Sequence, residues 1–216
     1  VFGKNTTAGA ISVTSKAPTF SPEASEELSV GSFNFVQARA AASGPLIGDT
    51  LAFRISGLTT RRDGVIDNVR TGAKQNAIGN QAVRGQLLFK PTTDLQLRLT
   101  ADFTNFESEC CTQVYLRVGQ SLRAATRQYA GPSGLAAQFG HAPPSTNPYD
   151  RKTDIDAALG VNTNEGGVSA IADWNLGRIG TLTSVSAWRF WNWDAENDRD
   201  YTGIPVQIIQ HIPSRQ

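Results

Sequence analysis

Few side chains in this sequence combine a reactive chemistry with a spacing that would bring them together. Cys110 and Cys111 are adjacent, and His141 and His211 lie in proline-containing irregular stretches with no nucleophile-elbow serine or cysteine beside them. Pairing either cysteine with His141 as a nucleophile and base has no support, because their sequence separation implies no proximity. Two cysteines also cannot complete the usual four-ligand zinc site, and they form either a strained vicinal disulfide or two free thiols. We expect no enzyme and no cofactor.

A second group of side chains carries the oxygen ligands that a hard cation prefers. Asp154, Asp156, Asn162, Asn164 and Glu165 follow one another closely. A calcium-binding loop needs such ligands at alternating positions around a central glycine. These residues do not follow that pattern, so we expect solvated loop side chains and no metal site.

Composition sets broad limits on the class of protein. The chain has 216 residues with 20 basic and 19 acidic side chains, giving a net charge of +1. Proteins that bind nucleic acid usually have a clustered basic excess, so we expect no nucleic acid partner. No apolar run approaches the roughly 18 residues of a transmembrane helix. The abundance of Thr, Ser, Asn and Gly favours strands and turns.

The elements that could position functional side chains are strands. Residues 95–103 alternate strictly, with leucines, alanine and phenylalanine on one face and Gln96, Arg98, Thr100 and Asp102 on the other. Residues 27–43 indicate one long extended segment with a bulge or a phase change. The other expected strands are 51–60, 83–90, 168–176 and 181–194.

The connections between these strands alternate in length. Segments 44–50, 91–94 and 177–180 are short, whereas 61–81 and 104–167 are long. In an up-and-down antiparallel sheet this places all short turns at one rim, as in outer-membrane barrels. The longer loop contains a helical spacing over 121–130, followed by Gly131 and Pro132, which predicts a short surface helix.

The first sixteen residues form a glycine-rich turn followed by a strand-like run over 10–15. Ala17 and Pro18 then lead toward the extended segment. This stretch resembles the end of the plug domain in TonB-dependent outer-membrane receptors, and Ser43–Leu46, Arg61–Gly64 and Val83–Pro91 resemble that family's first strands and turns. The residues of the motif are Gly3, Lys4, Asn5, Thr6, Thr7 and Gly9.

The resemblance implies an all-β fold made of antiparallel up-and-down strands of a transmembrane β-barrel. About six barrel strands are expected, preceded by the last strand of a plug. The implied organisation is a plug end over 1–16, a linker over 17–26, and the N-terminal part of a barrel over 27–216. Family members are several times longer, so we expect a fragment that lacks the segment that contacts TonB.

The resemblance also implies a function in the outer membrane of a Gram-negative bacterium. The expected partners are membrane lipid, the energy-coupling protein TonB, and a scarce bulky solute, most commonly an iron–siderophore complex. Arg54, Arg84 and Arg98 are expected to face the barrel interior. The long loop supplies the ligand-contact candidates Arg123, Arg127, Tyr129 and His141.

Two alternatives from other classes share the alternating strands. A passive porin has no need of the plug-like opening stretch. A soluble secreted β-sandwich that binds a ligand does not explain why short and long connections alternate. In that last case the strand arginines are surface charges.

Overall fold

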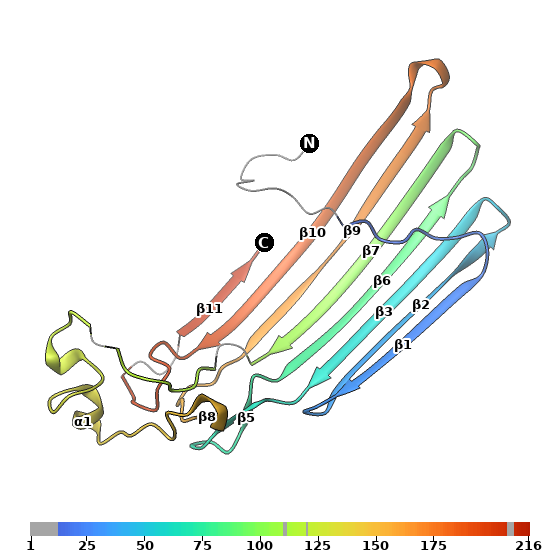
Figure 1. Cartoon of the computed structure of the whole chain (residues 1–216). Coiled ribbons are helices and arrows are strands. Elements are labelled where there is room, and N and C mark those ends of the chain that lie inside the picture. The colour runs from blue at the N-terminus through green and yellow to red at the C-terminus, as the bar shows by residue number, and fades with distance from the viewer. Residues whose placement is uncertain (1–12, 110–111, 120, 207–209) are drawn as a thin grey trace.

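The structure is a computed structural model that describes residues 13–109, 112–119, 121–206 and 210–216. It is an all-β chain dominated by one eight-stranded antiparallel sheet (Figure 1). The strands of this sheet are β1 (Glu23–Gly31), β2 (Phe35–Ile47), β3 (Leu51–Arg62), β6 (Ile78–Phe89), β7 (Leu95–Ser108), β9 (Val161–Asn175), β10 (Thr181–Asn197) and β11 (Gln210–Arg215).

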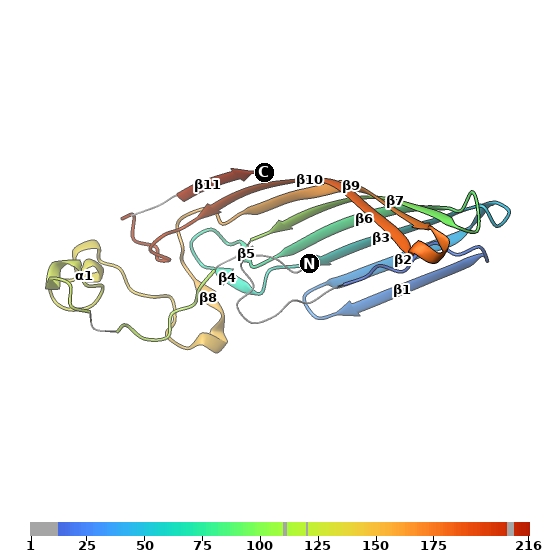
Figure 2. The ribbon, with the colours of Figure 1, turned by 90° about the horizontal axis from the view of Figure 1, so that it is seen from above.

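Each strand of the main sheet pairs with its neighbours in chain order, β1-β2-β3-β6-β7-β9-β10-β11. Seen from above, the strands form a single arched layer (Figure 2). Every pairing in this sheet is antiparallel. The up-and-down topology expected from the alternation of strands and turns is therefore confirmed.

The two rims of the sheet differ in the length of their connections. One rim carries the short turns 48–50, 90–94 and 176–180. The other carries the longer connections 63–77, 109–160 and 198–209 together with the tight turn 32–34. Figure 1 shows the short turns at one end of the strands and the extended connections at the other. We call the second end the loop rim.

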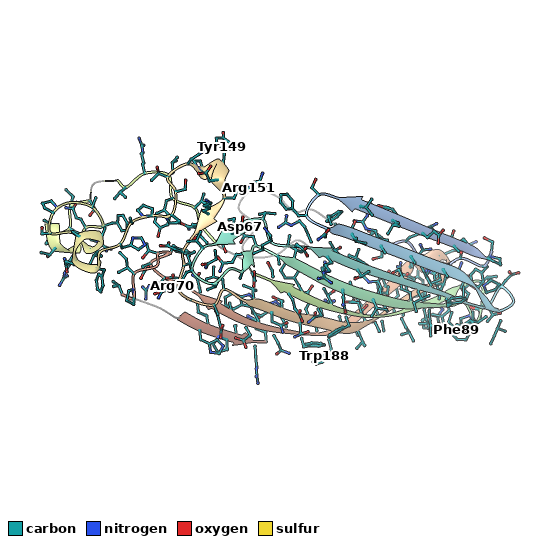
Figure 3. The ribbon with its side chains drawn as sticks, turned by 90° about the horizontal axis from the view of Figure 1, so that it is seen from below. Asp67, Arg70, Phe89, Tyr149, Arg151 and Trp188 are labelled. Carbon is teal, nitrogen blue, oxygen red and sulfur yellow. The ribbon has the colours of Figure 1, made fainter. Side chains whose placement is uncertain are left out.

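The two faces of the sheet differ in chemistry because successive side chains of a strand point to opposite sides. On one face, Leu99 lies across from Leu87 and Ala170, and Val168 lies across from Trp188. These large side chains are solvent-accessible, with 62% of Trp188 and 54% of Val168 exposed. Trp188 projects away from the sheet on this side (Figure 3). We call this the apolar face, and the opposite side the polar face.

The apolar face changes character toward the loop rim. Phe103 of β7 is followed on the same face by Asn105, which donates to Asn164 Oδ1 at 2.9 Å and to Asn162 Oδ1 at 3.4 Å. Glu107, the next residue of β7 on this face, pairs in register with Asn162. On β7, apolar side chains thus cover this face from the short turn only as far as Phe103.

The extended segment expected over 27–43 is a hairpin of two strands, and this prediction is wrong. β1 and β2 meet at a turn in which Phe33 and Asn34 both have positive φ, at 61° and 54°. Such turns normally have glycine at a position of positive φ, and here Phe33 occupies one of them. Gly31, Ser32 and Asn34 are turn-type residues that the interpretation as one extended segment did not use. β1 begins at Glu23, inside the stretch expected to be linker.

The strand count is corrected from about six to eight. The two strands that were not expected are the second half of the β1–β2 hairpin and β11. No strand is assigned to residues 13–15, the described part of the strand expected over 10–15. Hydrogen bonds from side chains of the sheet, rather than a backbone ladder, bind the N-terminal segment.

The loop rim contains the remaining secondary structure. The helix expected over 121–130 is only a single 3-10 turn, and the α-helix α1 follows after Gly131 and Pro132. No helix among the described residues is both long and apolar enough to cross a membrane. The rim elements are β4 (Ile66–Asn68), β5 (Lys74–Gln75), η1 (Ala125–Arg127), α1 (Leu135–Phe139), η2 (Pro148–Asp150) and β8 (Lys152–Thr153), and η3 (Gly177–Ile179) lies at the opposite rim.

The largest fully buried side chains among the described residues lie at the loop rim. Ile155, Ala157 and Leu159 form a small cluster against which Tyr201 packs. Ile204 is also buried, with 2% of its surface exposed. Within the described ranges no second layer of secondary structure covers the main sheet, and large side chains of its apolar face are exposed.

Candidate functional site

The polar face of the sheet holds the chain's own N-terminal segment. Arg84 of β6 donates to the Ser15 hydroxyl, and Gln86 Nε2 donates to the Lys16 carbonyl oxygen at 3.1 Å. The backbone N–H of Thr19 donates to Ser43 Oγ at 2.9 Å. In Figure 1 the segment crosses in front of the strands from which these side chains come. The polar face therefore binds the N-terminal segment, residues 13–22.

Ion pairs extend from the N-terminal segment along the polar face. Glu23 pairs with Arg54 and with Lys16, at 2.9 Å for the lysine. Asp102 of β7 accepts from Arg189 Nη2 at 3.1 Å and lies 3.5 Å from Arg84 Nη2. Two of the arginines expected to face inward, Arg54 and Arg84, thus lie on the polar face and have carboxylate partners.

Arg98, the third of these arginines, also lies on the polar face, since it shares that side of β7 with Asp102. Its buried Nε has no hydrogen-bond partner within the described part of the chain. An open groove of about 560 Å³ runs beside Arg84, Asp102 and Arg189. Charged side chains and an adjoining hollow make this face suited to polar occupants.

The three long connections at the loop rim are joined into one unit. β4 pairs in parallel with β8, which links connections 63–77 and 109–160. Asn68 Nδ2 donates to the Ile155 carbonyl at 2.8 Å, and Arg70 Nη1 donates to the Gly203 carbonyl at 2.9 Å. Figure 3 shows Arg70 among these connections, at the opposite end of the sheet from Phe89.

The tight turn 32–34, between β1 and β2, also contacts these long connections. The guanidinium of Arg151 lies over the Phe33 ring, 5.2 Å from its centroid. The Phe33 carbonyl accepts from the N–H of Asp63 at 2.9 Å, and Asp63 accepts from Asn34 at 2.7 Å. Contacts between consecutive connections thus extend across the loop rim.

Four polar side chains of connection 109–160 form a continuous hydrogen-bonded cluster, which we call the Tyr–His–Asp cluster. Tyr129 Oη lies 2.8 Å from His141 Nδ1, and His141 Nε2 lies 2.6 Å from Asp154 Oδ2. Tyr115 Oη donates to Asp154 Oδ1 at 2.8 Å. The rings of Tyr115 and Tyr129 each contact the imidazole, with centroids 6.1 and 5.7 Å away.

Burial gives this cluster its electrostatic character. Only 9% of the His141 side chain and 14% of the Asp154 side chain are exposed. Burial and the neighbouring Asp154 carboxylate raise the pKa of both Tyr115 and Tyr129, because each favours the neutral phenol. A cation placed among these groups would reverse that preference.

Two of the four ligand-contact candidates from the sequence, Tyr129 and His141, belong to this cluster. Arg123 and Arg127 do not join it and are exposed to solvent. Sequence reasoning missed Tyr115, and it considered Asp154 only as part of a calcium-type loop. The two residues lie 39 positions apart and carry no shared periodicity. Among the described residues, His, Cys, Asp and Glu side chains form no group of three or more suited to a metal ion.

Two further carboxyl groups are buried close by. Burial raises the pKa of Asp198 to about 6 and also raises that of Asp156. Asp198 Oδ1 accepts from the N–H groups of Asp200 and Tyr201 at 2.9 and 3.1 Å. Its Oδ2 has no hydrogen-bond partner in the described part of the molecule. The Asp198 carboxyl is therefore more easily kept neutral than an exposed one.

Several residues singled out in the sequence lie outside the described residues. These include the adjacent cysteines, Cys110 and Cys111. The choice between a vicinal disulfide and two thiols therefore stays open. The plug-like motif also falls there, with Gly3, Lys4, Asn5, Thr6, Thr7 and Gly9.

Comparison with known proteins gives limited guidance. The sequence matches none of the protein-family profiles. A search of solved structures finds a crystal structure of the siderophore receptor PirA from Acinetobacter baumannii, with a TM-score of 0.46 and 16% sequence identity. The match covers 93% of this chain and 26% of that receptor, so the chain spans about a quarter of its length. A likeness this weak carries no argument.

Proposed function

We propose that this chain forms part of the wall of an outer-membrane barrel in a TonB-dependent receptor. The observation that carries the proposal is the division of one curved sheet into an exposed apolar face and a charged face. The charged face also holds a segment of the same chain. A wall between lipid and a filled lumen needs this combination.

The dimensions of the apolar face support a membrane-facing role. On β7, outward apolar side chains run from Leu95 to Phe103, which is about 27 Å along a strand. The apolar band of an outer-membrane barrel is about 25 Å tall, and strand tilt shortens the projected height somewhat. Polar side chains, beginning with Asn105, then replace the apolar ones on the same face.

Within this proposal, the polar face lines the lumen. Through Ser15, Arg84 holds the end of a plug that enters the lumen. Arg54 pairs with Glu23 at the start of β1, and Glu23 pairs in turn with Lys16 of that plug end. The motif residues Gly3 to Gly9 would precede the residues that the polar face binds. Membrane lipid is then the partner of the apolar face.

The loop rim is the proposed site of solute capture. Its three long connections form one unit, and such a unit can present a shaped surface to a bulky solute. We propose an iron–siderophore complex as the solute, taken up with energy supplied through TonB. In this proposal the protein binds the solute and gates its passage, and it makes or breaks no covalent bond.

Opposite labelling of neighbouring residues on β10 tests the membrane assignment. Trp188→Cys and Arg189→Cys are made in the intact protein after both native cysteines are replaced by serine. We expect a lipid-soluble maleimide to label the first variant and a membrane-impermeant maleimide to fail on it in outer-membrane vesicles. Equal labelling of both positions by the aqueous reagent contradicts a lipid-facing wall, and recovery of the protein in a soluble fraction supports the β-sandwich alternative.

Uptake measurements test the transport assignment. Cells that express the intact protein are given one hydroxamate and one catecholate siderophore loaded with ⁵⁵Fe. We expect uptake of at least one siderophore, and we expect that uptake to be lost after removal of TonB or collapse of the proton gradient.

Deletion of 121–149 should weaken siderophore binding and leave membrane insertion unchanged. Unchanged affinity contradicts the role of the loop, and energy-independent uptake supports a porin.

A further inference from the structure

The Tyr–His–Asp cluster brings together three kinds of metal-binding donor. Asp154 supplies a carboxylate, His141 an imidazole nitrogen and Tyr115 a phenol oxygen. The third donor is a tyrosine, which distinguishes this set from a site built of histidine, cysteine and acidic side chains alone. The expectation of no metal site was based on Asp154 and Asp156 as parts of a calcium loop, which is a different arrangement.

We propose that Asp154, His141 and Tyr115 bind a ferric ion, and that Tyr129 positions His141. This site goes beyond the proposed uptake of an iron–siderophore complex, because it would hold the metal through side chains of the protein itself. The site is also independent of siderophore uptake, because all four of its residues belong to connection 109–160 and need no other part of a receptor. Iron binding by the cluster and siderophore uptake by the cell are separate measurements.

The spacing of the donors suits one metal ion. His141 Nε2 lies 2.6 Å from Asp154 Oδ2, and Tyr115 Oη lies 2.8 Å from Asp154 Oδ1. Neighbouring ligands of an octahedral ion with bonds of about 2.1 Å lie roughly 3 Å apart. Small shifts would therefore place an ion against the Asp154 carboxylate, flanked by the imidazole and the phenol. The remaining positions are left for water or a chelator.

The fourth member of the cluster fits the role of a positioning residue. Tyr129 Oη contacts Nδ1 of His141, the ring nitrogen that faces away from Asp154. Histidines that bind metals usually engage their second nitrogen in such a bond, which fixes the ring and its tautomer. With metal on Nε2, the ring proton would reside on Nδ1 and be donated to Tyr129 Oη.

The chemistry of the donors favours a highly charged cation. Binding through Tyr115 requires loss of the phenolic proton to solvent, so one proton is released for each ion bound. A trivalent ion offsets the cost of this proton loss better than a divalent one, because attraction scales with charge.

The fold also provides a place for the carboxylate. A side chain at Gly203 would meet the Asp154 carbonyl oxygen and Oδ2, both at 2.8 Å. The glycine therefore lets connection 198–209 lie directly against Asp154. Arg70 of connection 63–77 donates to the carbonyl of this same glycine.

Titration of the intact protein with ferric nitrilotriacetate in detergent tests the site. We expect a phenolate-to-iron charge-transfer band in the visible spectrum, saturating at one ion per chain. Tyr115→Phe should abolish the band. Tyr129→Phe should keep it, with affinity weakened about 10- to 100-fold as for other partners of metal-bound histidines. Tyr149→Phe, at a tyrosine with 89% of its surface exposed, is the matched control.

Other outcomes decide against the site. A band of equal strength in Tyr115→Phe and the unchanged protein overturns the assignment of Tyr115, and no band at saturating ferric nitrilotriacetate overturns the site. Tighter binding of Zn²⁺ than of ferric ion overturns the choice of metal. Affinity should rise about tenfold per pH unit while Tyr115 is protonated in the metal-free protein. Uptake of ⁵⁵Fe-siderophore in cells is scored separately, so failure of the site is distinguishable from failure of the transport function.

Discussion

Arg84 donates a hydrogen bond to the Ser15 hydroxyl, although the two residues are 69 positions apart in the chain. The contact joins the middle of the sheet to the segment that precedes its first strand. Gln86, two positions further along the same strand and on the same face, holds the Lys16 carbonyl. The polar face is thus matched to one particular stretch of the chain's own sequence.

Loss of this contact should loosen the N-terminal segment. Arg84→Gln shortens the side chain and removes the charged donor, which contributes on the order of 1 kcal/mol. We expect amide hydrogen exchange over residues 15–19 to become roughly fivefold faster, measured by mass spectrometry on the intact protein. Arg39→Gln, at an arginine whose ion pair is with Glu27, serves as the control. Equal protection in both variants would mean that Arg84 does not hold the segment.

A charge on the apolar face should hinder membrane insertion. Val168→Arg places a guanidinium near the middle of that face, at a cost of about 2–4 kcal/mol near the centre of a bilayer. Ser169→Arg, at the next residue of β9, points to the polar face and should be tolerated. The yield of folded protein in outer-membrane fractions measures the difference. Similar yields for both variants would argue against lipid contact.

Close approach of β9 and β10 depends on a glycine. A Cβ at Gly167 would lie 2.4 Å from the Trp188 carbonyl oxygen, a backbone atom that cannot move without disturbing the strand pairing. Gly167→Ala should therefore destabilise the sheet by about 1–3 kcal/mol, as other overpacking substitutions do. Gly85→Ala is the control, because nothing lies within 4 Å of its Cβ position. Resistance to heat unfolding in detergent should fall for the first variant alone.

The Asp198 carboxyl should make the loop rim sensitive to pH. Burial raises its pKa from 3.8 to about 6. The stabilisation from the protonated form is therefore complete below pH 3.8 and is lost as the pH rises through 6. Asp198→Asn keeps an oxygen acceptor for the two backbone amides and removes the charge, so it should stabilise the rim by up to about 3 kcal/mol at pH 8.

Hydrogen exchange over 198–206 between pH 5 and pH 8, corrected for intrinsic rates, measures this effect. The wild-type protein should lose protection across that interval, and Asp198→Asn should not. Identical pH profiles for the two proteins would show that Asp198 does not control the opening of this connection.

The β6–β7 hairpin shows how far the sequence alone could go. Strict alternation over 95–103 predicts which side chains share a face, and the short turn 91–94 fixes the pairing of the two strands. That register places Arg84 opposite Asp102, as the structure has it. This ion pair could have been predicted by extending the same reasoning.

The β1–β2 hairpin shows where the sequence misled. Phe33 and Asn34 adopt positive φ in the turn, and neither is a glycine. Phe33 is the residue that disfavours a turn here, whereas Gly31, Ser32 and Asn34 are compatible with one. Contacts from Arg151 and Asp63 to the turn supply the interactions that local sequence does not show.

What the sequence determined by itself is the all-β class, the alternation of faces and the unequal rims. These features follow from covalent backbone geometry, which sends successive side chains to opposite sides of a strand wherever it lies. Tertiary structure alone decided that Ser15 lies on Arg84 and that Tyr115 meets Asp154. Such contacts join residues whose separation in the chain carries no periodic signal, so only the packing of whole connections brings them together.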